Sequence, residues 1–317
     1  MSGKNIVLYI IVVAVLVFQT PNAGAETCEM ALADNGDVLD CAGRKIEAEK
    51  QFSRIISLYG AHTENLFSLG LEDEIIGVGR HPDYPPRARE KQRFSPHDGP
   101  EKFLAARPDL VLVRPMIDRG YEPLMKRLEK FGITVVSLQP GNVEEMKTYW
   151  RILGQLTGRQ EKASAMIEKF EKGVAQARLV AEKVDDKKTV YFEAIHDRFK
   201  TFTPGSMPVF ALECAGGINA AQDVRQVRGT NIAEFGKERI MEKGPEIDVY
   251  LAQQGPMNNV DAEDISGEPG YGVIKAVKEG EIYIVDEQIV SRPTLRLLEG
   301  IKTIGEILYP EVYKRSE

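Results

Sequence analysis

The sequence contains few of the residues that metal centres and disulfide-rich folds require. Its 317 residues include three cysteines, four histidines and one tryptophan. Three cysteines are too few for a zinc ribbon or a disulfide framework. No CxxC, GxxxxGK[ST] or HExxH motif occurs. A basic surplus is also missing, since the formal net charge is −7. Nucleic acid is therefore not expected as a partner.

Long hydrophobic runs are scarce as well, and the one that exists lies at the N-terminus. Residues 6–18 are apolar, follow Lys4, and precede Ala23-Gly24-Ala25. This order predicts a signal peptide over 1–25 and export to the periplasm. The alternative is a membrane anchor, but the run is shorter than the ~20 residues that a spanning helix needs. Cys28 does not follow a lipoprotein pattern, which favours a freely diffusing protein.

Export changes what the cysteines predict. Cys28 and Cys41 flank Asn35-Gly36, a strong hairpin-turn signal, so residues 26–50 are expected to form an N-terminal hairpin. Two cysteines on facing strands in an oxidising compartment can pair, and we predict a Cys28–Cys41 disulfide. Cys214 lies in an apolar helical stretch and is expected to be buried.

The rest of the chain alternates between strand and helix patterns, with one interruption. Alternation over 51–141 and again over 186–317 predicts an α/β fold of two lobes with mainly parallel sheets and a ligand cleft between them. The segment 142–185 between them is helical. Its second helix, expected over about 160–184, would span roughly 37 Å and join the lobes. The alternative is a long surface helix on a single domain.

The chain resembles the helical-backbone (class III) substrate-binding proteins of ABC importers, which serve ferric siderophores, haem and cobalamin. The resemblance covers nearly the whole chain after the leader. Its motifs, in order, include Val38-Leu39-Asp40, Arg54-Ile55-Ile56-Ser57-Leu58, Asp83-Tyr84-Pro85-Pro86, Arg107-Pro108-Asp109-Leu110-Val111, Ala215-Gly216-Gly217 and Ser291-Arg292-Pro293. The Asp83-Tyr84-Pro85-Pro86 segment is similar to the cobalamin branch and Ser291-Arg292-Pro293 to the siderophore branch. The resemblance implies two lobes joined by one rigid helix, and a binding protein rather than an enzyme.

Candidate ligand-binding residues lie in loops that follow strands, where ligands bind in open α/β sheets. All four histidines fall in such loops, and imidazole is a common ligand of iron and cobalt. We expect His62 and His196, one from each lobe, to reach the metal of a bound complex. Arginines in the same loops suggest an anionic ligand, although solvated surface charges are the ordinary alternative. The full candidate set is Tyr59, His62, Arg80, His81, His97, Arg114, His196, Arg198 and Arg292.

Two glutamates are expected to serve a second surface. The resemblance implies that Glu101 and Glu238 dock on basic pockets of the importer permease in the inner membrane, one from each lobe. Glutamates at helix starts are otherwise ordinary partners of the helix dipole.

The sequence thus predicts a monomeric periplasmic receptor for a small-molecule metal complex. An iron–siderophore is the first candidate, and cobalamin or haem comes next. No intrinsic cofactor is expected; the iron or cobalt belongs to the ligand. The alternatives are a receptor for an oxyanion such as molybdate or tungstate, and a chelatase-like enzyme that holds a metal and a tetrapyrrole.

Overall fold

Five parallel strands form the sheet of the N-terminal lobe. The computed structural model describes residues 28–313, except residue 48 and residues 227–229, so the predicted signal peptide lies outside the described residues. The strands, in the order β6-β5-β4-β7-β8, all pair in parallel. Their bounds are β4 (Ile55–Ser57), β5 (Ile75–Val78), β6 (Gln92–Arg93), β7 (Leu110–Val113) and β8 (Thr134–Ser137).

The parallel order requires a crossover between successive strands. Most of these crossovers are helical in this lobe, with bounds α1 (Gly60–Ser68), η1 (Pro86–Glu90), α2 (Pro100–Ala106), α3 (Pro115–Gly120) and α4 (Glu122–Lys130). All four residues of β7 are buried, as are all three of β4. Continuous apolar strands of this kind are typical of sheets that are covered on both faces. The carboxyl ends of β4, β5 and β7 consequently form one polar edge of the lobe.

The C-terminal lobe contains a seven-stranded mixed sheet. Its order is β12-β13-β10-β9-β14-β15, with β11 also paired to β9. The bounds are β9 (Thr189–Ile195), β10 (Lys200–Phe202), β11 (Ile218–Asn219), β12 (Arg225–Gln226), β13 (Ile232–Glu234), β14 (Val249–Gln254) and β15 (Ile282–Asp286). The strands β9, β11, β14 and β15 pair in parallel. Beside β9, the strands β10, β13 and β12 pair in antiparallel order, which the sequence patterns did not predict.

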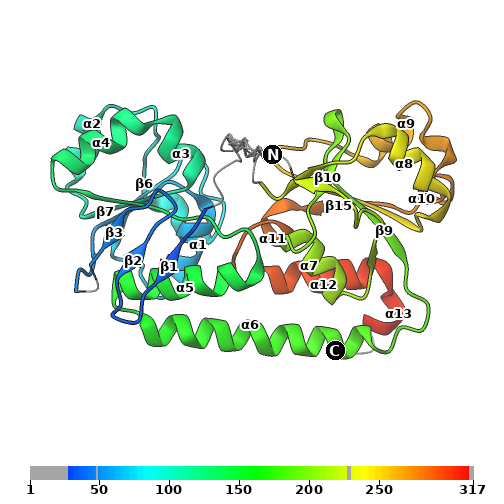
Figure 1. Ribbon diagram of the computed structural model, residues 1–317, viewed down its shortest axis with the longest axis horizontal. Helices are drawn as coiled ribbons and strands as arrows, with labels where there is room; N and C mark the ends of the chain where they lie inside the picture. Colours follow the sequence, from blue (N-terminus) through cyan, green and yellow to red (C-terminus); the bar gives the residue numbers. More distant parts are fainter. Residues whose placement is uncertain (1–27, 48, 227–229, 314–317) are drawn as a thin grey trace, which may run out of the picture.

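Short helices connect these strands, and longer ones pack the lobe against the middle of the molecule. Their bounds are η2 (His196–Arg198), α7 (Met207–Cys214), α8 (Lys237–Lys243), η3 (Gly244–Glu246), α9 (Ala262–Gly267), η4 (Tyr271–Val273), α10 (Lys275–Glu279), α11 (Glu287–Val290), α12 (Leu297–Leu308) and α13 (Pro310–Tyr313). Figure 1 shows the two lobes side by side, with α12 running beneath the C-terminal sheet.

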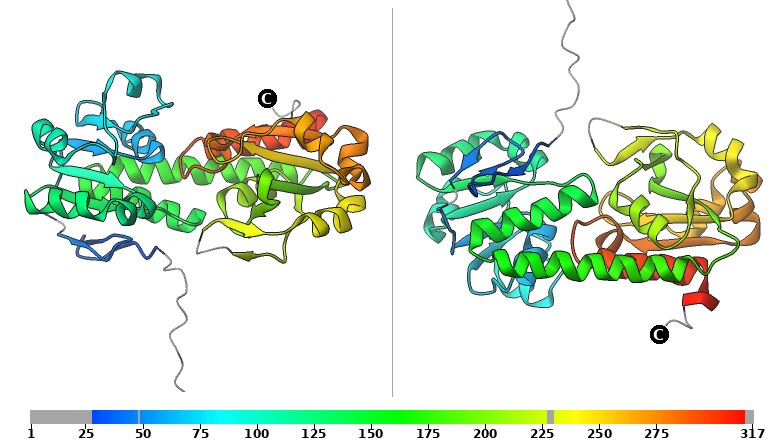
Figure 2. Two further views of the ribbon diagram at one scale, coloured as in Figure 1. Left: turned by 90° about the horizontal axis from the view of Figure 1, so that it is seen from above. Right: turned by 60° about the horizontal axis from the view of Figure 1, so that its bottom comes forward.

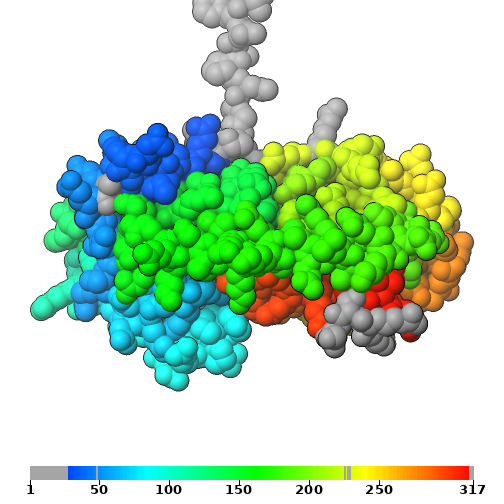
Figure 3. Space-filling model, turned by 90° about the horizontal axis from the view of Figure 1, so that it is seen from below, coloured from blue at the N-terminus to red at the C-terminus, as the bar shows by residue number. Residues whose placement is uncertain are grey.

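One helix crosses from lobe to lobe, as the sequence predicts. Helix α5 (Val143–Thr157) ends at Gly158, whose φ of 66° suits glycine, and α6 (Gln160–Ala181) then runs for 22 residues, about 33 Å. Midway along α6, the Phe170 ring lies 5.6 Å from Trp150 of α5 and 6.2 Å from Phe210 of α7. Figure 3 shows α6 lying across the surface of both lobes. The predicted two-lobe α/β fold is confirmed.

A small third sheet lies on the outside of the N-terminal lobe (Figure 2). Its antiparallel strands are β1 (Ala31–Leu32), β2 (Val38–Leu39) and β3 (Lys45–Ile46). The turn between β1 and β2 contains Gly36 at a φ of 85°, where the hairpin was expected. The predicted disulfide between Cys28 and Cys41 is present, and Cys214 is a buried free thiol.

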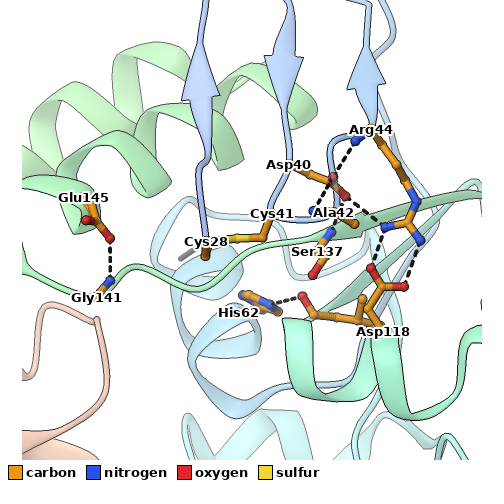
Figure 4. The surroundings of a disulfide bond; sticks show 11 residues. Cys28, Asp40, Cys41, Ala42, Arg44, His62, Asp118, Ser137, Gly141 and Glu145 are labelled. Atoms are coloured by element: carbon orange, nitrogen blue, oxygen red, sulfur yellow. Dashed lines mark hydrogen bonds and ion pairs between the residues drawn. A yellow bond between two sulfur atoms is a disulfide. The ribbon is translucent and has the colours of Figure 1, made fainter. Parts of the chain in front are cut away.

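Buried charge fastens this small sheet to the lobe (Figure 4). Asp40, which has 0% exposure, accepts the backbone N–H groups of Arg44 and Ser137. The Arg44 guanidinium donates two bonds to Asp118 of α3, at 2.7 and 2.8 Å. Because hydrogen-bond donors satisfy both buried carboxylates, these bonds hold the small sheet against the lobe.

Within the described part of the chain, no helix has the length and apolarity to cross a membrane.

Candidate ligand-binding site between the lobes

Two arginines from different lobes approach the same tyrosine. Tyr59 follows β4 and Arg114 follows β7, so both lie at the carboxyl edge of the N-terminal sheet. The Arg114 guanidinium carbon lies 5.0 Å from the centre of the Tyr59 ring. Arg292, which follows α11, covers Gly60: a Cβ built at Gly60 would lie 2.9 Å from Arg292 Nη1. A side chain at position 60 would therefore displace this arginine.

Two carboxylates accompany the arginines. Asp83 Oδ2 lies 3.4 Å from Arg292 Nη2 and joins the N-terminal lobe to the C-terminal half. Glu287, the first residue of α11 after β15, has a raised pKa because it is partly buried, although Arg292 and Arg114 oppose the shift. Burial likewise raises the pKa of Tyr59 against the same two cations. We call Tyr59, Asp83, Arg114, Glu287 and Arg292 the interlobe cluster.

The interlobe cluster has an unused donor. Arg292 Nη1 is buried and has no hydrogen-bond partner among the described residues. Among the described residues Arg114 forms no ion pair, and its guanidinium packs on the Tyr59 ring. Buried guanidinium groups are normally paired, so the arrangement is suited to an incoming anion. The exposed Met116, in α3 after β7, and the exposed Met257, in the turn after β14, offer apolar surface near strand ends of both lobes.

A short segment holds Arg292 in place. We call residues 291–296 the strap. The carbonyl of Pro293 accepts from Asn65 Nδ2 at 3.0 Å and from Trp150 Nε1 at 3.3 Å, both in the N-terminal half. Arg296 donates two bonds of 3.1 Å to the buried Glu64 of α1. The strap is therefore a second connection between the lobes, in addition to α6.

His62 does not face the ligand site, which corrects the expectation that it contacts the ligand or its metal. The side chain has 0% exposure. Its Nε2 bonds to the carbonyl of Val113 at 3.0 Å, and its Nδ1 bonds to the Tyr149 hydroxyl at 2.6 Å. Burial lowers the pKa of His62 to about 4. No ring nitrogen remains for a metal.

His196 lies in a separate cluster inside the C-terminal lobe. Its Nδ1 bonds to Glu193 at 2.9 Å, and its Nε2 lies 3.8 Å from Glu268. The bond to Glu193 raises the pKa of His196. The structure therefore does not bring His62 and His196 together as a metal pair. No group of three or more histidine, cysteine or acidic side chains among the described residues is arranged to hold a metal ion.

The other predicted ligand residues lie on the surface. Arg80, His81, His97 and Arg198 are exposed, and within the described ranges no hydrogen bond, ion pair or ring contact joins any of them to the interlobe cluster. His97 instead packs against Tyr121, whose hydroxyl lies 2.8 Å from its Nε2. A strand-end loop can be several residues long, so belonging to one does not place a side chain beside the ligand.

Two surface hollows lie away from the interlobe cluster. One of about 330 Å³ is lined by Thr189, Ile218 and Ile247, at the amino ends of strands of the C-terminal sheet. The other, about 590 Å³, is a shallow face of α4 around Phe131. In parallel sheets ligands bind at the carboxyl ends of strands, so neither hollow competes with the interlobe cluster.

Comparison with known proteins decides the family. Residues 55–289 match the periplasmic binding protein family. The chain belongs to that family. A substrate-binding lipoprotein of an uncharacterised ABC transporter in Bacillus subtilis is 25% identical over 279 residues, covering 87% of this chain and 86% of the relative. A vitamin B12-binding protein of Vibrio campbellii is 26% identical over 257 residues, covering 80% and 88%.

A solved structure agrees with the fold. A possible iron-binding (periplasmic solute-binding) protein of Staphylococcus epidermidis superposes with a TM-score of 0.72 at 27% identity, covering 82% of this chain and 100% of that one. These relatives bind substrates and are not enzymes, so this periplasmic binding protein is a substrate-binding component of an ABC transporter and not a chelatase.

Both predicted docking glutamates of this periplasmic binding protein are exposed and occupy equivalent positions. Glu101 is the second residue of α2 and Glu238 the second of α8, and each helix follows a glycine, Gly99 or Gly236. The Glu101 side chain is 77% exposed, 4.0 Å from Arg127. Figure 1 shows α2 and α8 on different lobes, at the side away from α6. One partner that spans both lobes can reach both carboxylates.

Sequence reasoning missed Asp83 and Glu287 as members of the interlobe cluster. Both had a usable signal, because Asp83 follows β5 and Glu287 follows β15. An acidic residue in such a loop can neutralise an arginine from a distant segment, as Asp83 does for Arg292.

Proposed function

We propose that this periplasmic binding protein captures an anionic metal complex between its lobes and delivers it to the permease of an ABC importer. The observation that carries the proposal is the convergence of Arg114 and Arg292 on Tyr59, with one Arg292 nitrogen unpartnered. Guanidinium groups bind carboxylate and related oxygens in two-pronged geometry. The Tyr59 ring beside Arg114, together with the exposed Met116 and Met257 after strands of the two lobes, suits a ligand with apolar parts.

An iron–siderophore is the first candidate, and cobalamin or haem comes next. With both nitrogens of His62 occupied and His196 bonded to Glu193, the interlobe cluster offers no imidazole to a metal. The ligand's own donor atoms must then satisfy the metal, as they do in a siderophore complex. The iron or cobalt is cargo, and the protein needs no intrinsic cofactor. Names of relatives that mention iron or vitamin B12 support this class.

The remaining parts of the proposal concern location and assembly. A signal peptide over residues 1–25 would place the mature protein in the periplasm. The Cys28–Cys41 disulfide supports an oxidising compartment. We propose that the receptor acts as a monomer, because its two lobes are already joined by α6 and by the strap.

The binding test is titration of the purified protein with ferric complexes of a hydroxamate, a catecholate and citrate, and with cyanocobalamin, haemin and molybdate. One ferric complex should bind. Replacing both Arg114 and Arg292 by alanine should lower that affinity about 100-fold, as expected for two charged hydrogen-bonding partners. The matched control replaces the exposed Arg80 and Arg198 and should change little. Tight binding of molybdate alone would support the oxyanion alternative, and equal losses in both double variants would contradict the site.

Docking is tested separately from capture. Glu101→Ala with Glu238→Ala should leave ligand affinity unchanged and weaken uptake through the matching importer, more so at low salt. The control replaces Glu122 and Glu263, exposed glutamates in the first turns of α4 and α9, and should not affect uptake. A loss of ligand affinity in the Glu101/Glu238 variant would assign these residues to the ligand site instead.

A further inference from the structure

His62 has a role that its burial makes possible. We infer that His62, Tyr149 and Asn65 form a buried network that positions both arginines of the interlobe cluster. The inference rests on the proposed function, because those arginines are its proposed ligand contacts. Its members come from two helices, α1 and α5, and it ends on two backbone carbonyls.

The protonation of the network follows from its partners. Val113 offers only a carbonyl oxygen, so His62 Nε2 must carry the hydrogen and donate at 3.0 Å. Nδ1 of the neutral ring then has a lone pair, and the Tyr149 hydroxyl donates to it at 2.6 Å. The Tyr149 oxygen in turn accepts from Asn65 Nδ2 at 3.3 Å. The second hydrogen of that amide goes to the Pro293 carbonyl at 3.0 Å. One tautomer satisfies every link.

The two ends of the network adjoin the two arginines. Val113 is the residue before Arg114, and Pro293 is the residue after Arg292. The network therefore fixes the backbone from which each guanidinium extends, one in the N-terminal lobe and one in the strap. His62 also packs edge-on against Tyr59, with ring centres 5.1 Å apart, beneath the ring that Arg114 covers. A single buried imidazole thus connects Tyr59, Arg114 and Arg292.

Burial makes the network rigid. His62, Asn65 and Tyr149 each have 0% exposure. A hydrogen bond in such surroundings has no water to replace it, so a missing partner leaves a buried polar group unsatisfied. The expected consequence of a break is a shift of the Val113 or Pro293 backbone, and of the arginine beside it.

The test removes one oxygen atom. Tyr149→Phe keeps the packing of the ring and deletes the central link. The matched control is Tyr191→Phe, because Tyr191 also has 0% exposure and its hydroxyl has no partner among the described residues. Both variants are titrated at 15 °C with the ferric complex that the wild-type protein binds best. Tyr149→Phe should bind about tenfold more weakly, and Tyr191→Phe should bind as the wild type does.

A spectroscopic measurement separates positioning from general loosening and needs no ligand. The side-chain Nε–Hε signals of Arg114 and Arg292, assigned with the variants Arg114→Lys and Arg292→Lys, should both move in Tyr149→Phe and in His62→Leu. They should stay in place in Tyr191→Phe. In the wild-type protein, the ¹⁵N shifts of His62 should show the neutral Nε2–H tautomer.

Each outcome decides the inference. Unmoved arginine signals in Tyr149→Phe, or unchanged affinity, would show that the network stabilises the fold without positioning the arginines. The opposite His62 tautomer would be incompatible with this series of hydrogen bonds and would also contradict the inference. If no complex binds the wild-type protein, the proposed ligand class fails, while the arginine signals still decide whether the network positions those side chains.

Discussion

Each lobe has a histidine after the first strand of its main sheet, and the surroundings of the two histidines shift their pKa values in opposite directions. His62 follows β4, is fully buried and is neutral, with a pKa of about 4. His196 follows β9 and is bonded to the buried carboxylate of Glu193, which raises its pKa. Burial disfavours the charged ring of His62, although the Val113 carbonyl opposes this shift, whereas the bond to Glu193 stabilises the charged ring of His196.

The hydrogen bonds around His62 and those around His196 also differ in which parts of the molecule they connect. The network of His62 ends on the strap and so connects the lobes. The cluster of His196 closes within one lobe, because Glu193 accepts from Tyr250 at 2.5 Å and from Asn258 at 3.2 Å. We therefore expect that substitutions in the His62 network affect ligand binding, whereas substitutions in the His196 cluster affect stability alone.

The largest effect should come from Glu193→Ala. It removes an acceptor shared by three donors, the partly buried His196 and the buried Tyr250 and Asn258, so the free energy of unfolding should fall by about 3–5 kcal/mol. Urea denaturation measures the loss. Glu234→Ala, on the exposed face of the same sheet, is the control and should change stability by less than about 1 kcal/mol. Ligand affinity of the folded Glu193→Ala protein at 15 °C should match the wild type; a large drop would contradict the separation of the two clusters.

The histidines should give stability opposite pH dependences. The folded-state pKa of His62 lies below its ordinary value of 6.5, so the unfolded chain binds the extra proton first. Stability is then lost as the pH falls from about 6.5 to about 4, by roughly 3 kcal/mol. For His196 the raised pKa means that its contribution is present below pH 6.5 and is lost as the pH rises through the folded value.

Unfolding free energies measured across this range test the assignment. His62→Gln should flatten the acidic side of the curve relative to the wild type, and His196→Gln should flatten the side above pH 6.5. If the two variants change the same side, the contrast between the neutral and the charged histidine is wrong.

A third contrast is covalent. The N-terminal lobe carries the Cys28–Cys41 disulfide, which closes a loop with a sequence separation of 13, whereas Cys214 of the C-terminal lobe is a free thiol. Reduction should lower the unfolding free energy by about 3 kcal/mol, the usual size for a loop of this length. Denaturation with and without reductant measures it. The variant with both Cys28→Ser and Cys41→Ser should not respond to reductant, and its ligand affinity should be that of the wild type.

The smallest effect should come from Lys237→Met. Lys237 bonds to Glu268 and lies 5.5 Å from the centre of the Phe199 ring. Both charged side chains are partly exposed, so the loss should be about 1 kcal/mol or less. Without this lysine, Glu268 acts on His196 alone, and the pKa of His196 should rise in an NMR titration. A fall would show that His196 does not interact with Glu268.

Local sequence patterns predicted the helices and turns better than they predicted the surroundings of individual side chains. The apolar period of α6 and the turn at Gly36 depend on neighbours in the sequence, and both were predicted correctly. The strand-end rule also led to Arg114 and Arg292. Strand β9 extends to Ile195, so Glu193 lies inside the sheet, and the sequence patterns did not predict this buried charge.

The environment of His62 could not be predicted in this way. Its partners Val113 and Tyr149 lie 51 and 87 positions further along the chain. Whether a histidine after a strand is buried depends on such distant segments, and no local period encodes it. The same holds for Asp83 and Arg292, which are separated by 209 positions and meet only when the lobes come together.

The strap has a practical consequence because its Pro293 carbonyl accepts the indole hydrogen of Trp150. Trp150 is the chain's one tryptophan. Indole emission responds to the loss of a hydrogen bond and to entry of water, so the unlabelled protein carries its own optical probe at the junction of its lobes. A shift of its emission to longer wavelength on ligand binding would report that the strap leaves the N-terminal lobe. Unchanged emission would report that the receptor takes up its cargo with this junction closed.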